Sequence, residues 1–302
     1  APRALQPPAA TLPQPPHATM MIRIAALLTL CLSTSAFVAR PASFAGVRRT
    51  ALGFRGGARR DTVVSKAYEY EGCTIDNVGV VLLAGGTGSR MKANMPKQFL
   101  DLAGKPVLQH TLELFLSLDG ITQVVLVLGK EFQESEPWKS LQADNPKLIF
   151  ALPGKERQDS VLSGMQEVNK DAPVVAIHDA ARPLITPNEV YKVLKDGIEH
   201  GAAVLGVPMK ATVKESEDGH FVLKTIDRSR LWEVQTPQVI RPQMLLDGFK
   251  KVEELGLEVT DDVSIIEQLG LPVKLTLGEY TNLKLTTPED MAVAEEILKS
   301  RA

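Results

Sequence analysis

The sequence is poor in the residues that crosslink a chain or anchor it in a membrane. Cys31 and Cys73 are the two cysteines among 302 residues, too few for a disulfide framework or a cysteine-ligated metal site. No apolar run reaches the ~20 residues that span a bilayer. We therefore expect no disulfide scaffold and no membrane partner. The composition, with 44% hydrophobic and 23% charged residues, is typical of a soluble globular fold.

Acidic residues are absent from the first sixty positions. Residues 1–60 contain eight arginines and so carry +8, whereas the whole chain carries −2, which leaves −10 for the remainder. A protein that binds the nucleic-acid backbone needs a basic surface. The acidic body therefore argues against a nucleic-acid partner, although a local cationic pocket for a small anion remains compatible with it.

The N-terminal stretch is typical of a targeting sequence. Residues 1–19 are rich in Pro and Ala without periodicity, and we expect translation to begin at Met20 or Met21. Residues 20–36 then supply a short charged start, an apolar run and a small-residue cleavage site, as in a signal peptide. Residues 37–65 form a transit-like segment, which is Arg-bearing and free of acids up to Arg60, as in a transit peptide.

A signal peptide followed by a transit-like segment is typical of the bipartite presequence that leads into a complex plastid. We therefore predict a cleaved presequence with its linker over residues 1–75, import into the plastid stroma, and one domain over residues 76–302. A secretory leader before a basic linker is the alternative. A body with one cysteine fits the plastid better.

The body alternates between short β-branched runs and longer helical periods, which predicts an α/β fold with a mostly parallel sheet and helices on both faces. The expected strands span residues 78–83, 123–128, 147–152, 173–178, 202–207 and 273–277. The expected helices span residues 107–118, 158–168, 187–199, 241–254, 262–268 and 288–301.

One region, residues 208–234, interrupts this alternation. Val213 and residues 221–226 flank Asp218-Gly219, a two-residue hairpin signal. A hairpin inserted into an α/β core tends to project, so we expect an arm that contacts a partner.

A glycine turn, LAGGTGSRM at residues 83–91, follows the first expected strand. It lacks the third glycine of a dinucleotide fingerprint and the Gly-Lys-Ser/Thr ending of a P-loop, which disfavours both. Backbone N–H groups after a strand can converge on an anion. Arg90 and Lys97 add two cations nearby, so the stretch predicts a polyphosphate site; a tight turn without function is the alternative.

Polar residues also follow two later apolar runs. In IHDAARP, residues 177–183, Asp179 and Arg182 come at the end of an expected strand, where open α/β sheets bind ligands. We expect both to contact a ligand and His178 to be structural. PGKERQDS, residues 153–160, opens a helix with polar side chains. Lys284 lies just before another helix start.

Together these motifs resemble the 2-C-methyl-D-erythritol 4-phosphate cytidylyltransferases of the non-mevalonate isoprenoid pathway. LAGGTGSRM, PKQFL, GKERQDSV, HDAARP, TPQ, VTDD and NLKLTTPEDM occur in this order within residues 78–300. The resemblance implies a Rossmann-like, GT-A-like nucleotidyltransferase fold. It also implies transfer of CMP from CTP to methylerythritol phosphate by in-line attack on the α-phosphorus, with release of pyrophosphate and with Mg²⁺ on the nucleotide phosphates.

The resemblance further implies roles for individual residues. It makes Arg90, Lys97 and Lys284 catalytic. The residues implied to hold the nucleotide are Ala84, Gly85, Gly86, Gly154, Ser160, Asp179 and Ala180. Those implied to hold the polyol phosphate are Thr212, Arg228, Thr260, Asp179 and Arg182. A homodimer would exchange its arms, so that Arg228 reaches the neighbouring site.

Three other functions fit parts of this pattern. A ribitol-5-phosphate cytidylyltransferase would share the fold and chemistry, but the plastid-type presequence favours the isoprenoid role. A sugar-1-phosphate nucleotidyltransferase often carries C-terminal β-helix repeats, which this sequence lacks. A catalytically inactive nucleotide-binding module is disfavoured because Arg90 and Lys97 are both present.

Overall fold

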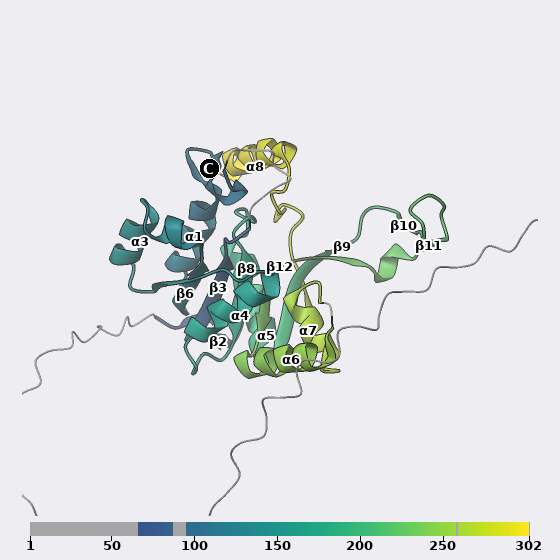
Figure 1. Cartoon of the computed structure of the whole chain (residues 1–302), viewed down its shortest axis with the longest axis horizontal. Helices are drawn as coiled ribbons and strands as arrows, with labels where there is room; N and C mark the ends of the chain where they lie inside the picture. Colours follow the sequence, from purple (N-terminus) through teal and green to yellow (C-terminus); the bar gives the residue numbers. More distant parts are fainter. Residues whose placement is uncertain (1–65, 87–94, 258, 302) are drawn as a thin grey trace, which may run out of the picture. The chain divides into compact units, whose positions relative to one another are not determined.

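A seven-stranded sheet forms the centre of the fold (Figure 1). The structure is a computed structural model that describes residues 66–86, 95–257 and 259–301. The expected signal peptide and transit-like segment lie outside these ranges, so the presequence and the domain limits stay predictions. Within the described ranges, no helix combines the length and the apolar character needed to cross a bilayer.

The sheet is mostly parallel, as the sequence predicts. Its strands, in spatial order, are β13 (Lys274–Leu277), β9 (Ala202–Pro208), β12 (Trp232–Ile240), β8 (Val175–Asp179), β3 (Val78–Leu83), β6 (Ile121–Val127) and β7 (Leu148–Ala151). Only β12 runs antiparallel to both of its neighbours, β8 and β9. The other neighbouring pairs are parallel.

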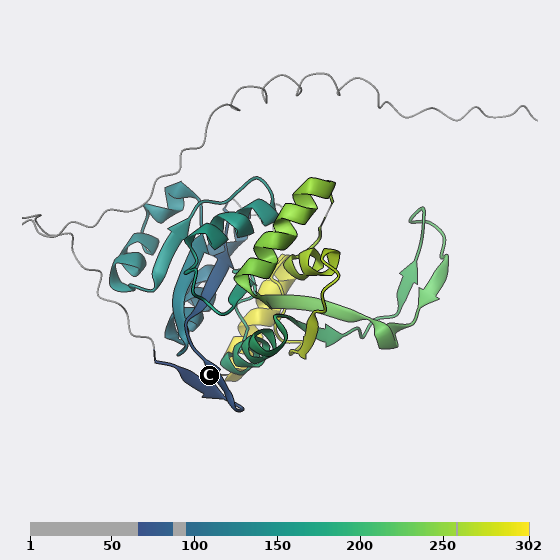
Figure 2. The ribbon, with the colours of Figure 1, turned by 90° about the horizontal axis from the view of Figure 1, so that it is seen from below.

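Helices cover both faces of the sheet (Figure 2). One buried cluster joins the sheet to α1 (Val107–Ser117), α3 (Trp138–Asp144) and α5 (Pro187–His200). The opposite cluster joins it to α4 (Arg157–Glu167), α6 (Pro242–Leu255) and α7 (Asp262–Gln268). Along β3, Val80 and Leu82 enter the first cluster and Val81 the second, because successive side chains of a strand point to opposite faces.

Local sequence signals account for where helices begin and end. In α5, Thr186 and Glu189 form a reciprocal capping box, and Pro187 occupies the first turn. Gly201 ends the helix with φ 91°, a conformation that favours glycine. The C-terminal helix α8 (Pro288–Arg301) packs in a separate small cluster that includes Leu285.

Each of the expected strands and helices is present, with ends within two residues of the expected ones. The sequence did not predict β12, because its buried part contains Gln235, Thr236 and Gln238 instead of an apolar run. The short helices α2 (Lys130–Gln133) and α3 were also missed.

A second missed element precedes the sheet. Strands β1 (Tyr68–Tyr70) and β2 (Cys73–Ile75) form an antiparallel hairpin in the stretch expected to be a linker. Tyr68 stacks on Tyr191 of α5, with ring centroids 4.0 Å apart. The folded part of the chain therefore begins before residue 76.

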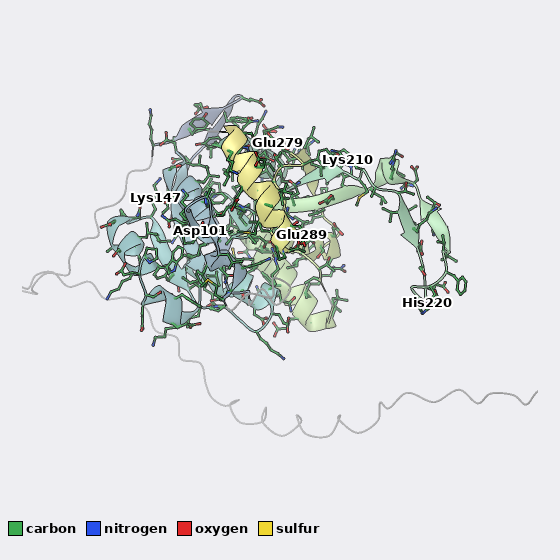
Figure 3. All side chains as sticks on the ribbon, turned by 90° about the horizontal axis from the view of Figure 1, so that it is seen from above. Asp101, Lys147, Lys210, His220, Glu279 and Glu289 are labelled. Atoms are coloured by element: carbon green, nitrogen blue, oxygen red, sulfur yellow. The ribbon has the colours of Figure 1, made fainter. Side chains whose placement is uncertain are left out.

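The arm is present as a projecting hairpin of β10 (Val213–Glu215) and β11 (Lys224–Ile226) (Figures 1 and 2). Its connection, residues 216–223, is longer than the expected two-residue turn, so the strand expected from residue 221 begins at Lys224. Asp218 organises this connection, since its carboxylate accepts from the N–H groups of His220 and Phe221. Figure 3 labels Lys210 near the base of the arm and His220 near its tip.

The contact between α5 and β12 gives a test of this packing. A Cβ at Gly197 would lie 2.3 Å from Cγ1 of Val239, which is fully buried. We expect Gly197→Ala to lower the free energy of unfolding by about 1–2 kcal/mol, because overpacking outweighs the gain in helix propensity. Denaturant unfolding measures this change. The control Glu199→Ala, exposed on the same helix, should change it by less than ~0.5 kcal/mol. A Gly197→Ala protein whose free energy of unfolding matched or exceeded that of the parent would contradict this packing.

Candidate active site

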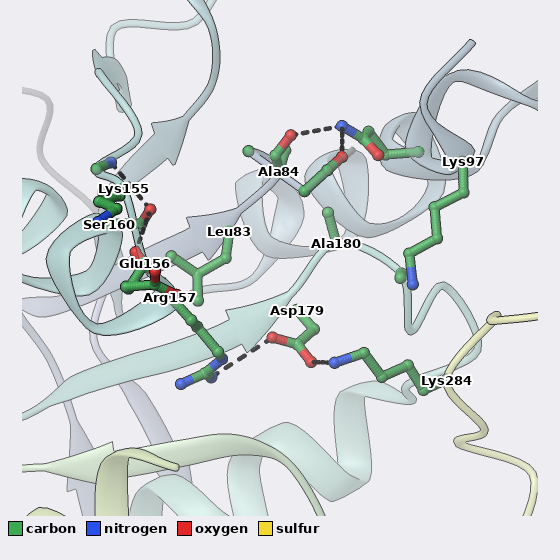
Figure 4. Close-up of a pocket in the computed structure, with 15 residues that line it drawn as sticks. Leu83, Ala84, Lys97, Lys155, Glu156, Arg157, Ser160, Asp179, Ala180 and Lys284 are labelled. Atoms are coloured by element: carbon green, nitrogen blue, oxygen red, sulfur yellow. Dashed lines mark hydrogen bonds and ion pairs between the residues drawn. The ribbon is translucent and has the colours of Figure 1, made fainter. Parts of the chain in front are cut away.

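A pocket opens where β3 and β8 end. The two strands are adjacent and parallel, and their register pairs Leu83 with Asp179, so both connections leave from the same edge of the sheet. Ligands bind at this edge in open α/β sheets. The cavity of about 260 Å³ is lined, among the described residues, by Leu83, Ala84, Gly85, Gly86, Lys97, Gln98, Gly154, Lys155, Glu156, Arg157, Ser160, Asp179, Ala180, Ala181 and Lys284 (Figure 4).

The glycine turn is fixed by a buried amide. Gln98, in the short helix η2 (Lys97–Phe99), is 4% exposed, and its Nε2 donates to the carbonyls of Ala84 at 2.6 Å and Gly86 at 3.1 Å. In a trans peptide the carbonyl and the next N–H point in opposite directions. Gln98 therefore turns the Gly85 N–H away from itself and leaves the start of the turn with one backbone orientation.

Two glycines allow close packing at the pocket. Gly85 lets the glycine turn approach Pro153, and Gly154 lets its own segment fold back against Asp159. A Cβ at Gly85 would lie 2.6 Å from Cβ of Pro153, and one at Gly154 would lie 2.2 Å from Cβ of Asp159. The Ser160 hydroxyl accepts from the Gly154 N–H at 3.0 Å and donates to the Glu156 carbonyl at 3.1 Å. These bonds make residues 154–160 a rigid wall of the pocket.

Alternating charges cross the floor of the pocket. Arg157 binds both carboxylate oxygens of Asp262 at 2.8 Å and lies 3.5 Å from Asp179. Lys284 donates to the other oxygen of Asp179 at 2.5 Å. We name this array of Lys284, Asp179, Arg157 and Asp262 the charge array. It joins four segments that are far apart in the sequence.

The charge array fixes the ionisation of Asp179 and Arg157. Burial alone would raise the pKa of Asp179, but Arg157, Lys284 and Arg182 outweigh it and hold that pKa well below its usual range. Burial disfavours the charge of Arg157, yet Asp262 and Asp179 raise its pKa further above neutrality. Asp179 and Arg157 therefore stay charged across the physiological pH range.

Lys97 supplies a further cation at the pocket. Its Nζ donates to the Leu285 carbonyl at 2.9 Å, which connects η2 to the segment that carries Lys284. His178 lies behind the pocket and is fully buried, and burial lowers its pKa to about 4. A neutral His178 bonded to Thr236 at 3.0 Å fits the structural role expected for it.

The structure brings together most of the site residues expected from the sequence. The pocket lining contains Ala84, Gly85, Gly86, Lys97, Gly154, Ser160, Asp179, Ala180 and Lys284. Arg90 lies outside the described residues. The roles of these residues stay predictions.

Apart from Asp179, the residues expected to hold the polyol phosphate are not among the lining residues. Arg182 is 8% exposed, and its guanidinium donates to the backbone carbonyls of Asn282 and Val234. Thr212 and Arg228 are exposed on the arm, where Arg228 donates to the Lys210 carbonyl. Thr260 is exposed just before α7.

Gln98 and Arg157 are among the polar lining residues that received no catalytic or binding role from the sequence. Gln98 could have been noticed as a polar residue between hydrophobic neighbours in PKQFL. Arg157 was visible in its motif, but its pairing with Asp262 joins positions 105 residues apart. Without coordinates, no local signal links the two motifs.

Comparisons with known proteins give one consistent family. Residues 78–300 match the family model described as 2-C-methyl-D-erythritol 4-phosphate cytidylyltransferase. A chloroplastic rice protein with this name is 52% identical over 225 residues, which are 74% of this chain and 75% of the rice protein.

Solved structures agree with this match. The 4-diphosphocytidyl-2C-methyl-D-erythritol synthase of Anaerococcus prevotii aligns with a TM-score of 0.66 and 25% identity, over 74% of this chain and 96% of its own. The 2-C-methyl-D-erythritol 4-phosphate cytidylyltransferase of Thermus thermophilus aligns with a TM-score of 0.62 and 31% identity, over 74% and 98%.

The charge array predicts how stability depends on pH. An ionised Asp179 with a lowered pKa stabilises the fold above the unfolded pKa of about 4, and this contribution disappears as pH falls through the folded pKa. Lys284 and Arg157 are 37% and 34% exposed. Because solvent screens them, we expect Asp179→Asn to lower the free energy of unfolding by only about 1–3 kcal/mol at pH 7.

Denaturant titrations at several pH values measure this difference between the parent and Asp179→Asn. It should stay constant from pH 7 to about pH 5 and shrink below about pH 4. Asp144→Asn, an exposed control in α3, should show little difference at any pH. No loss at pH 7, or a loss that grows on acidification, would contradict the assigned ionisation.

Proposed function

The chain belongs to the family of 2-C-methyl-D-erythritol 4-phosphate cytidylyltransferases, and we propose how its pocket performs the transfer of CMP from CTP to methylerythritol phosphate. The observation that carries the proposal is the convergence of a glycine turn, Lys97 and Lys284 on one pocket at the carboxyl ends of β3 and β8. The products are 4-diphosphocytidyl-2-C-methyl-D-erythritol and pyrophosphate.

The reaction is a single displacement at phosphorus. An oxygen of the 4-phosphate attacks the α-phosphorus of CTP in line, and the bond to the bridging oxygen breaks as pyrophosphate leaves with the electron pair. The protein needs no covalent intermediate, so positioning and charge stabilisation carry the catalysis.

Cations stabilise the charge that moves during the displacement. In this proposal Lys97 and Lys284 contact the phosphates, Arg90 joins them, and the negative charge that grows on pyrophosphate strengthens these contacts in the transition state. Asp179 holds the Lys284 ammonium near the pocket before the nucleotide enters. Lys284 then exchanges this carboxylate for a phosphate oxygen.

The rigid walls select the nucleotide. Ala84, Gly85 and Gly86 bring backbone close to the ligand, and Gly154 with Ser160 forms a narrow wall that suits a pyrimidine. Asp179 and Ala180 face the ribose side in this proposal. The Gly154 N–H is already engaged by Ser160, so the wall is formed before the ligand binds.

A divalent cation fits the chemistry of the lining. Mg²⁺ prefers oxygen ligands, and the carboxylates among the described lining residues are Asp179 and Glu156. Both oxygens of Asp179 already contact cations, so we propose that the nucleotide phosphates supply most ligands, with Asp179 as the carboxylate that could join them. When bound, Mg²⁺ neutralises triphosphate charge and makes pyrophosphate a better leaving group.

The polyol phosphate site requires a second copy of the chain in this proposal. Thr212 and Arg228 are carried by the arm and are not part of the pocket lining described within one chain. A homodimer that exchanges arms would bring Arg228 to the neighbouring pocket, near Thr260 and Arg182. The exposed Phe221, Val222 and Leu223 in the arm suit burial against a partner.

The rice relative is named chloroplastic, and we propose a plastid location for this chain as well. The acid-free, Arg-bearing N-terminal stretch supports import by a cleaved bipartite presequence into the stroma of a complex plastid. The isoprenoid role is favoured over ribitol phosphate for the same reason.

Pyrophosphate release tests the reaction. Purified protein with CTP and Mg²⁺ should release pyrophosphate with methylerythritol phosphate at least ~100-fold faster than with ribitol 5-phosphate, because arm and pocket contacts fit one polyol. ATP, GTP and UTP in place of CTP serve as nucleotide controls. Equal or faster release with ribitol 5-phosphate would reassign the acceptor.

Mixing two impaired variants, at a polyol phosphate concentration below the raised KM, tests the exchanged arm. Lys97→Ala should lower kcat with little change in CTP affinity, since its contact strengthens in the transition state. Arg228→Ala should chiefly raise the KM for the polyol phosphate. If arms exchange, random re-pairing of equal amounts should restore about a quarter of the parental sites.

The matched control mixes Lys97→Ala with Lys284→Met. Both changes affect the same pocket, so each mixed dimer retains one defect per site and activity should not recover. Recovery in this control, or none with Arg228→Ala, would contradict arm exchange.

A further inference from the structure

A set of buried polar side chains lies beside the pocket and has no part in the reaction described above. Asn282 is fully buried, Gln235 is 2% exposed and Thr236 is 4% exposed. Buried polar groups are costly unless their hydrogen bonds are made. Their bonds therefore indicate which parts of the site they hold together.

Asn282 attaches the segment before Lys284 to β12. Its Nδ2 donates to Oε1 of Gln235 and to the Thr236 carbonyl, both at 3.0 Å. The backbone carbonyl of Asn282 accepts a hydrogen bond from the Arg182 guanidinium at 2.8 Å. Gln235 in turn donates to the Glu279 carbonyl at 3.0 Å, so the amide of Asn282 closes a network around residues 279–282.

The same network reaches the partner of Lys284. The Thr236 hydroxyl accepts from the Asp179 N–H at 3.2 Å, while Asn282 binds the Thr236 carbonyl. Lys284 comes two residues after Asn282 and binds the Asp179 carboxylate. Asn282 is thus connected to both members of the Lys284–Asp179 ion pair. It reaches the Asp179 backbone through Thr236, and it lies two residues before Lys284 in the chain.

The donor side of the Asn282 amide is the part in use. Both recorded bonds of its side chain come from Nδ2, and its buried Oδ1 has no hydrogen-bond partner among the described residues. An aspartate has nearly the same shape, but its ionised carboxylate has no proton to donate to the two acceptors, Oε1 of Gln235 and the Thr236 carbonyl. The position therefore requires an amide donor.

We propose that Asn282 is a positioning residue that sets the place of Lys284 for phosphoryl transfer. This inference rests on the proposed function for its effect on rate, but the position of Lys284 does not depend on the identity of the substrate. Asn282 acts through Lys284 and touches no reacting atom. A displacement of about 1 Å at a catalytic cation is enough to cost up to ~100-fold in rate.

Asn282→Asp tests the role through kinetics. We expect kcat for pyrophosphate release to fall by about 10–100-fold, with the KM for the polyol phosphate nearly unchanged. In a Lys284→Met background the same substitution should lower kcat by less than ~2-fold, because interacting residues are not additive. If Asn282→Asp lowered kcat by the same factor in the Lys284→Met background as in the parent, the two residues would act independently and the proposal would be overturned.

Lysine modification tests the same role without activity. Limited acetylation followed by peptide mass spectrometry should show Lys284 reacting several-fold faster in Asn282→Asp than in the parent, relative to the exposed Lys250, as the pair with Asp179 loosens. An unchanged rate would overturn the proposal, even if the parent proved inactive with CTP and both polyol phosphates. Such inactivity would instead contradict the proposed function.

Two further variants keep the test independent of folding. Gln235→Met removes one of the two acceptors of Asn282 and should reproduce both effects at smaller size, even if Asn282→Asp fails to fold. Tyr191→Ala removes the stacking with Tyr68, away from the pocket lining, and should destabilise the protein without changing kcat or Lys284 reactivity. Equal effects from Tyr191→Ala would overturn a specific role.

Discussion

The Asp179 carboxylate, held between Lys284 and Arg157, is the interaction on which the site depends. It terminates β8, beside the strand that leads into the glycine turn, and so links the sheet to two cations from distant segments. A carboxylate buried without these cations would be protonated or expelled. The cations in turn would repel one another without Asp179. The sheet edge and the charge array therefore specify the pocket together.

The polar interior of β12 supports this arrangement. Its antiparallel direction places Gln235, Thr236 and Gln238 beside the end of β8, where they bind the Asp179 backbone, Asn282 and the start of α7. An apolar strand in this place would pack the sheet equally well but would leave those groups without partners. A strand that departs from the hydrophobic pattern is thus the one that organises the site.

The sequence predicted the parts of the fold that local periodicity determines. Apolar runs and helix caps placed each expected strand and helix, and the strand-end rule placed Asp179 at the pocket edge. Periodicity could not reveal β12, because its buried residues are polar, or the hairpin β1–β2, because two three-residue strands are too short to show a period. The Arg157–Asp262 pair and the role of Gln98 depend on tertiary contacts, which no local pattern records. The arm was predicted from Asp218-Gly219, although the connection is longer than that signal implies.

In the proposed function, the charge array forms a pocket in which Lys97 and Lys284 receive the phosphates of CTP. A crystal structure of the protein with CTP and Mg²⁺ tests it most directly. We expect the triphosphate against Lys97 and Lys284, the base against residues 154–160, and the Arg157–Asp262 pair intact. A nucleotide bound elsewhere, or phosphates that leave both lysines without contact, would contradict it.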